Sequence, residues 1–191
     1  MLAFVIFVFA VAGMIKGTIG LGLPAVSMGL LSLVISPFQA ATLLIIPSMV
    51  TNFWQLFAEG RVLRLVQRFW PLLVGMIIGS VWCVFPTLGH GEFQSEALLG
   101  GMLAIYGLYG LFAKNMPNLA PYEKYLSPIM GYLGGALTVA TGVVVIPVVP
   151  YLQSLHLKRD DLVQSLGLTF TVSTLCLAVY LHLNPVEDTP I

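Results

Sequence analysis

A cation and several glycines interrupt the most apolar stretch of the chain, residues 1–35. These residues are Lys16, Gly17, Gly20 and Gly22, and no other charged residue occurs in that stretch. A helix that breaks inside a membrane exposes free N–H groups at the start of its second part, and the helix dipole makes that point positive. Glycines also let a ligand approach the backbone closely. Donors and a cation where water is scarce are the groups that a small oxyanion requires.

Two simpler interpretations of these residues stay open. Glycines in membrane helices often serve close helix packing, and a lysine in a tilted or re-entrant segment can extend its side chain to the membrane surface. A cation that stays buried is costly and therefore indicates a function. The spacing GxxGxG, with no strand before it, is not that of a dinucleotide-binding loop.

Further polar residues recur at helical spacing in other apolar segments. Asn52 and Gln55 share one helix face with Ser48 and Thr51, as three- and four-residue spacings predict. Hydroxyl groups in membrane helices often bond only to their own backbone, so the amides are the stronger candidates to line a pathway. The predicted substrate-binding residues are Lys16, Gly17, Gly20, Gly22, Asn52, Gln55, Thr141, Gly142, Gln164 and Thr171.

The composition indicates the environment in which these residues lie. Of 191 residues, 58% are hydrophobic and 8% are charged, whereas a soluble domain has roughly 25% charged residues. Apolar runs of roughly 18 residues or more, enough to cross a bilayer, recur along the chain. The sequence therefore predicts an all-α, polytopic membrane helix bundle, because backbone groups in lipid must be paired within helices. The zero net charge gives no sign of nucleic-acid binding.

The sequence carries no motif of an enzyme, a metal site or a cofactor. Cys83 and Cys176 lie far apart in apolar runs and form neither a CxxC pair nor a disulfide framework. No HExxH motif or Walker motif occurs. We therefore expect no enzymatic activity, no cofactor, no metal and no ATP-driven pump.

Six hydrophobic segments are predicted helices: 1–35, 38–57, 69–88, 97–113, 126–155 and 162–183. The first and fifth are too long for one straight crossing and carry Gly and Pro in their middle, so we expect each to be broken or re-entrant. Arginines in the loop 58–68 place that loop in the cytoplasm by the positive-inside rule. The loop 89–96 is then outside and the loop 114–125 inside, while the side of the loop 156–161 stays open.

The two broken segments also indicate an internal repeat within a single membrane domain, 1–191. A shift of 122 residues aligns Gly13 with Gly135, Gly20 with Gly142, and Thr51 with Ser173. We interpret 1–115 as the first repeat and 116–191 as the second, which is incomplete because it has no counterparts of the third and fourth segments. Broken helices at matching positions of a repeat are typical of secondary transporters and indicate the substrate site. We therefore expect the two breaks to lie close together near the middle of the membrane, with their glycine-rich turns facing each other.

Four stretches carry a resemblance to a known family. They are KGTIGLGLPAVSMGLL (16–31), FQAATLLIIPSMVTNFWQL (38–56), TGVVVIPVVPYLQSL (141–155) and LVQSLGLTFTVSTLCLA (162–178). They resemble the TauE/SafE family of membrane transporters, the group of sulfite exporters and toluene-sulfonate uptake permeases. The resemblance implies two related halves and the transport of sulfur-containing oxyanions or organosulfonates.

We therefore expect a secondary transporter of small anions that works by alternating access around the two broken helices. An anion channel and a non-catalytic membrane subunit or truncated fragment are the alternatives. The expected location is a cell membrane, the bacterial inner membrane, with several crossings. The expected partners are a small anion, the lipid bilayer, and either a second copy of the chain or a separate C-terminal part.

Overall fold

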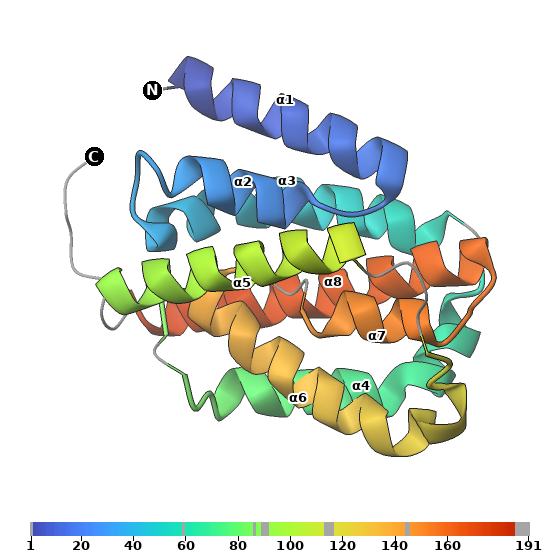
Figure 1. Ribbon diagram of the computed structural model, residues 1–191. Coiled ribbons are helices and arrows are strands. Elements are labelled where there is room, and N and C mark those ends of the chain that lie inside the picture. The colour runs from blue at the N-terminus through green and yellow to red at the C-terminus, as the bar shows by residue number, and fades with distance from the viewer. Residues whose placement is uncertain are drawn as a thin grey trace.

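The computed structural model describes residues 2–58, 60–85, 87–88, 92–112, 117–143 and 146–185 (Figure 1). Within these ranges the chain is helical and contains no strand. The α-helices are α1 (Leu2–Ile19), α2 (Leu23–Leu31), α3 (Pro37–Phe57), α4 (Val62–Val81), α5 (Glu92–Phe112), α6 (Glu123–Thr141), α7 (Val148–Ser154) and α8 (Arg159–Leu183). A single 3-10 turn, Ala120–Tyr122, precedes α6.

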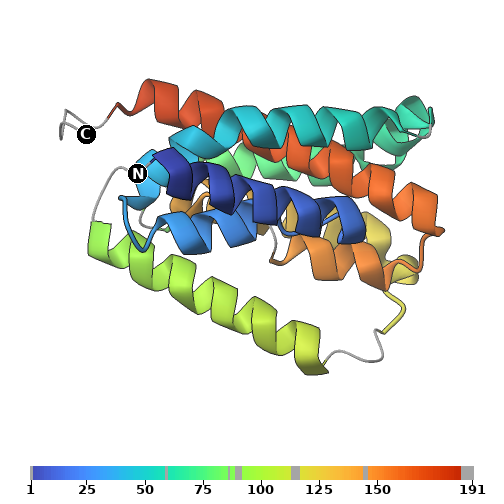
Figure 2. The same ribbon diagram turned by 90° about the horizontal axis from the view of Figure 1, so that it is seen from above.

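Helices α1, α3, α4 and α8 are long and apolar enough to cross a membrane, and α5 contains a shorter apolar stretch, Glu96–Leu111. This confirms the predicted multi-pass helix bundle. Helix α6 is not among these helices, and its second half, residues 134–141, is buried along its whole length. It therefore packs inside the bundle, and α5 lies at the edge (Figure 2).

Both long apolar segments are broken at glycines, as predicted. Helix α1 ends before Gly20, whose φ of +79° is a conformation that suits glycine, and α2 begins after Gly22. Helix α6 ends before Gly142, which has a φ of +74°. In each case the glycine N–H donates to the carbonyl four residues earlier, that of Lys16 or Thr138, at 2.7 Å. Each pair of helices, α1 with α2 and α6 with α7, doubles back on itself (Figure 1).

The two glycine turns do not face each other at one level of the bundle, as their sequence similarity led us to expect. A methyl group added to Gly20 would lie 3.6 Å from Gln55, near the end of α3, and one added to Gly142 would lie 3.5 Å from Ala41, near its beginning. These two levels are about 21 Å apart along α3, at 1.5 Å per residue. The reason is that α1 and α6 have 18 and 19 residues, so each nearly crosses the bundle before it turns.

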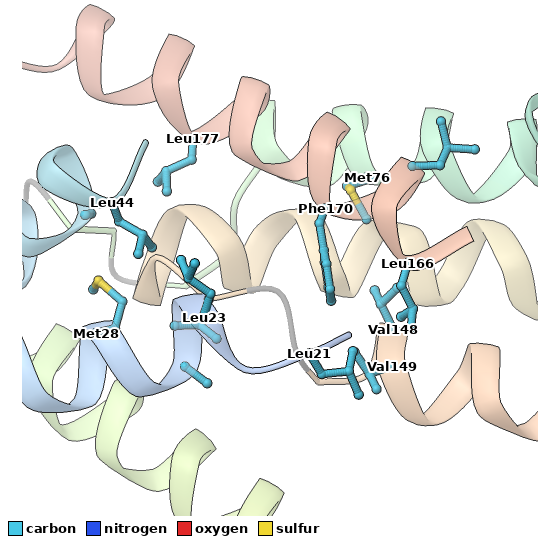
Figure 3. Close-up of a cluster of buried hydrophobic side chains, with 14 of the residues drawn as sticks. Leu21, Leu23, Met28, Leu44, Met76, Val148, Val149, Leu166, Phe170 and Leu177 are labelled. Carbon is cyan, nitrogen blue, oxygen red and sulfur yellow. The ribbon is translucent and has the colours of Figure 1, made fainter. Parts of the chain in front are cut away.

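Apolar residues next to each turn fill the space between the two hairpins. Figure 3 shows Leu21, from the first break, beside Val148 and Val149 at the start of α7. Phe170 of α8 points between the helices in the same view. The two breaks therefore meet through their flanking residues within one hydrophobic core.

Close backbone contacts explain the glycines of α4 and α6. A methyl group added to Gly79 would lie 2.0 Å from the carbonyl oxygen of Tyr132, and one added to Gly135 would lie 2.0 Å from that of Met76. The glycines of the GMIIG stretch, 75–79, therefore allow α4 to pack closely against α6. The glycines at 100–110 in α5 do not pack in this way, because a methyl group added to any of them would meet nothing within 4 Å.

Two ion pairs mark one end of the bundle, which we call the charged end. Arg61 bonds to Asp161 at 2.9 Å, and Arg68 bonds to Glu123 at 2.7 Å. The first pair joins the α3–α4 connection to the start of α8, so residues 156–161 lie at the same end as the arginine-rich segment. The sequence left the side of the loop 156–161 open, and the structure places this loop on the same side as the arginine-rich segment.

Several predicted helix bounds were wrong at the charged end. Helix α4 begins at Val62 and ends at Val81, so Arg64 and Arg68 belong to a helix rather than to a loop 58–68. Helix α8 begins at Arg159. Charged residues can occupy the first turns of a membrane helix where these reach the surface. The predicted loops 89–96 and 114–125 lie partly outside the described residues.

Candidate functional site

Lys16 is buried, although it is a cation in the last turn of an apolar helix. Only 6% of its surface is exposed, so it does not extend to the membrane surface. Its Nζ donates to Thr51 Oγ1 at 3.0 Å and to Asn52 Oδ1. Both partners are neutral oxygens, and both belong to the polar face of α3.

The lysine contacts the second half of the chain as well. Its Nζ lies 5.8 Å from the centre of the Phe170 ring in α8, within the range of a cation–π contact. Asn52 Nδ2 donates to Thr174 Oγ1 at 3.2 Å. In the part of the chain that the structure describes, neither ion pair involves Lys16. The cation is thus surrounded by dipoles and an aromatic ring.

Two glutamines link α3 and α8 nearer the charged end. Gln55 Nε2 donates to the carbonyls of Val163, at 2.9 Å, and Gly20, at 3.1 Å. Gln164 Nε2 donates to the carbonyl of Leu56 at 2.6 Å. The carbonyls of Gly20 and Leu56 lie at helix ends, where backbone oxygens have no helical partner. The two amides therefore satisfy these oxygens and hold both helices together.

The backbones of α3 and α8 touch beside these amides. A methyl group added to Gly167 would lie 2.7 Å from the backbone nitrogen of Leu56. The ion pair Arg61–Asp161 lies beyond this contact. Among the described residues, the charged end of the α3–α8 pair is therefore closed.

A small pocket separates the same two helices on the other side of Lys16. It is lined by Pro24, Leu44, Ile45, Ser48, Gly142, Phe170, Ser173, Thr174 and Leu177. Pro24 lies in the first turn of α2, directly after the first break, and Gly142 belongs to the second break. Phe170 and Thr174 belong both to the pocket and to the surroundings of Lys16. The pocket therefore adjoins the buried cation.

The structure brings only part of the predicted residue set together. Lys16 and Asn52 touch directly, Gln55 contacts Gly20, and Gly142 lines the pocket. Gly22 begins α2 with a φ of +102°. Gly17 is exposed, and a methyl group added there would meet nothing within 4 Å.

The two predicted threonines bond to their own helices. Thr141 Oγ1 donates to the carbonyl of Leu137, and Thr171 Oγ1 donates to that of Gly167, each at 2.7 Å. Both side chains are buried. This is the simpler role that the sequence left open for hydroxyl groups.

Sequence reasoning did not select two residues that the structure places here. Phe170 lies in an apolar run, where an aromatic ring carries no signal of a contact with a cation. Ser48 was recognised as part of the polar face of α3 but was not chosen over its amide neighbours. Its Oγ is buried and has no hydrogen-bond partner, which no sequence pattern could show. No group of three or more His, Cys, Asp or Glu side chains suited to a metal occurs among the described residues.

A comparison with family models identifies the relatives of this chain. Residues 5–188 match the model described as Sulfite exporter TauE/SafE. The chain belongs to this family. TauE/SafE proteins are membrane transporters of anions, and the match includes every residue of the site described above. Searches of curated proteins and of solved structures gave no match.

Membership of the TauE/SafE family agrees with the chemistry of the site. The family's general function is anion transport across a membrane, and a buried cation attracts an anion; in this chain Lys16 is such a cation inside an apolar helix. The chain is thus a multi-pass membrane protein with a buried cation that contacts both α3 and α8.

Proposed function

We propose that this chain is a secondary transporter of small sulfur-containing oxyanions or organosulfonates, located in a bacterial inner membrane. One observation carries the proposal: Lys16 is buried among neutral groups, without a carboxylate partner among the described residues. A buried charge is costly unless it is paired. The transported anion supplies the missing partner, because sulfite-like ions combine a negative charge with several acceptor oxygens.

Alternating access around the two breaks is the mechanism that we propose. At the charged end, the Gln55 and Gln164 amides and the Arg61–Asp161 pair hold α3 against α8. On the other side of Lys16, the same helices leave a pocket. An arrangement that is closed at one end and leaves, beyond Lys16, a pocket with room for only about one water molecule favours a gated transporter over an open anion channel. By the positive-inside rule, the closed end faces the cytoplasm.

An inverted repeat would explain how the protein could alternate between a state closed at the charged end and a state closed at the opposite end. The helix ends Ile19 and Thr141 differ by 122 positions, and so do the helix starts Pro37 and Arg159. The offset also relates two contacts: Lys16 bonds to Thr51 and Thr138 bonds to Ser173, each across 35 positions. These correspondences support our proposal that 1–115 and 116–191 are related units of one membrane domain.

The test uses the full chain in liposomes loaded with sulfite. Lys16→Met should keep the fold, since removal of an intramembrane charge is not costly, but efflux of sulfite should collapse. Lys16→Arg should retain part of the activity, because the guanidinium differs from an ammonium in shape and hydration. The matched control is Lys124→Met, which removes an exposed lysine at the charged end and should leave efflux unchanged.

Titration of the purified protein with sulfite gives a second measurement. A hydrogen bond to a charged group contributes about 1.5–3 kcal/mol, so the Lys16→Met variant should bind at least about tenfold more weakly. Equal affinity and equal efflux in wild type and Lys16→Met would refute the role of this lysine. Conduction that does not saturate and shows no counterflow would instead identify a channel.

A further inference from the structure

Ser48 differs from its threonine neighbours because its buried hydroxyl has no hydrogen-bond partner, a feature it shares with Ser27 and Ser32, and of these three serines Ser48 lines the pocket. Thr51, Thr171 and Thr174 each donate to a carbonyl of their own helix, at 2.7–2.9 Å. Ser48 is 1% exposed, and its Oγ has no partner. A buried hydroxyl without a partner is unfavourable, so a group that it contacts during function would account for it.

The side chain of Ser48 faces the pocket between the two breaks. Ser48 lies three and four residues before Thr51 and Asn52, hence on the same face of α3 and one turn farther from the charged end. The residues that close the pocket opposite it are Ser173 and Thr174 of α8 and Gly142 of the second break.

Ser48 is also the hydroxyl in this pocket whose hydrogen remains available. Thr174 donates its hydrogen to the carbonyl of Phe170 and accepts from Asn52. Thr138 donates to the carbonyl of Gly134, so the hydrogen between Thr138 and Ser173 comes from Ser173. An acceptor that enters the pocket would therefore meet the free O–H of Ser48.

The surroundings restrict the charge of such an acceptor. Leu44, Ile45 and Leu177 make most of the pocket wall apolar, and Lys16 is the neighbouring cation. The cost of transferring an ion from water rises with the square of its charge. A divalent anion would therefore be dehydrated at a much greater cost than a monovalent one, with one cation and one hydroxyl to offset it.

We propose that Ser48 and this pocket form the site at which a singly charged oxyanion, of the R–SO3⁻ or hydrogensulfite type, is held next to Lys16 on its way from the face opposite the charged end. This deepens the proposed function and rests on it. The pocket selects a monovalent over a divalent anion, and the Ser48 hydroxyl donates to one oxygen of the ion.

The test compares methanesulfonate with sulfate on the purified full chain by calorimetric titration. Wild type should bind methanesulfonate, and sulfate at least about tenfold more weakly. Ser48→Ala should weaken methanesulfonate binding about tenfold or more, as expected for a lost bond to a charged group. It should not lower thermal stability, because it removes an unpaired buried hydroxyl.

The chain offers a matched control in Ser27→Ala. Ser27 is also fully buried and its Oγ also lacks a partner, but it does not line the pocket. This variant should bind methanesulfonate as wild type does. If Ser48→Ala does not fold, Ser48→Cys in a background without Cys83 and Cys176 replaces it. Methanesulfonate, but not an equal concentration of sulfate, should then protect the new thiol from a thiol reagent.

Different results would refute the two proposals separately. Unchanged methanesulfonate affinity in Ser48→Ala, absent protection of Ser48→Cys, or equal affinity of wild type for sulfate and methanesulfonate overturns the inference about the pocket. If Lys16→Met still abolishes sulfite efflux in that case, the proposed transport function stands. If wild type neither binds nor transports any of these anions, both proposals fall.

Discussion

Replacing Gln164 by leucine should loosen the closed end of the α3–α8 pair without unfolding the protein. The Gln164 amide makes one bond, to the Leu56 carbonyl at 2.6 Å, while its own Oε1 is buried without a partner. Leucine removes the bond and the unpaired oxygen together. We therefore expect little change in overall stability and a specific loss of the contact that joins the two helices.

The size of the effect follows from the number of bonds lost. A neutral hydrogen bond between membrane helices contributes about 0.6 kcal/mol on average, and up to about 1.5 kcal/mol elsewhere in proteins. Gln164→Leu should then shift the equilibrium toward the open charged end about three- to tenfold. Gln55→Leu also removes one bond between α3 and α8, to Val163, so its shift should be of similar size; it additionally removes the bond from α3 to Gly20 at the end of α1.

Spin labels at Ala58 and Lys158 would measure this opening, because both residues are exposed at the charged end, after α3 and before α8. In liposomes, wild type should give mainly one short distance between the labels, and the glutamine variants a second, longer one. Gln67→Leu, which changes an exposed amide of α4, should match wild type. Identical distance distributions in wild type, Gln164→Leu and Gln55→Leu would refute the assignment of these amides as a closure.

Two further predictions concern glycines, and thermal unfolding of the purified protein checks both. Gly79→Ala should destabilise the protein by about 1–3 kcal/mol, because the new methyl group overlaps a backbone carbonyl, whereas Gly107→Ala should be neutral; equal melting temperatures of the two variants would contradict this. Gly20→Ala should cost about 1–2 kcal/mol through its left-handed backbone alone. Gly142→Ala should cost more, because its methyl group would also lie 2.8 Å from Met28, and the reverse order of these two costs would be the contrary result.

The sequence was most informative at residues whose type is unusual for the apolar segment in which they occur. A lysine in an apolar segment and glycines in the middle of a long one identified the breaks and the buried cation, because few residue types tolerate a left-handed backbone or burial of charge. The polar face of α3 was also readable from its spacing. The partners of Lys16 were not, since Thr51 and Asn52 lie 35 and 36 positions away and only the fold brings them near.

The errors have equally physical causes. Arg64 and Arg68 were read as loop residues because charge usually marks solvent, but the first turns of α4 lie at the charged end, where Arg68 pairs with Glu123. The similar glycine turns were expected to face each other, although two hairpins that enter from opposite ends place their turns at opposite ends. Phe170 and the unpaired oxygen of Ser48 depend on packing between distant helices, which composition and spacing do not encode.

The neutral partners of Lys16 suit a cation that must bind an anion and then release it. A carboxylate in place of Asn52 would neutralise the ammonium and compete with the substrate, and a buried ion pair is costly to break. Amide and hydroxyl oxygens hold the Nζ in position and leave its charge available. Thr138 and Ser173, which lie 122 positions after Lys16 and Thr51, make a contact of the same kind without a charge. Among the described residues, Lys16 therefore offers a positive charge next to the pocket between α3 and α8, on the far side of the glutamines from the charged end, and under the proposed function one such charge suits the binding of one singly charged anion at a time.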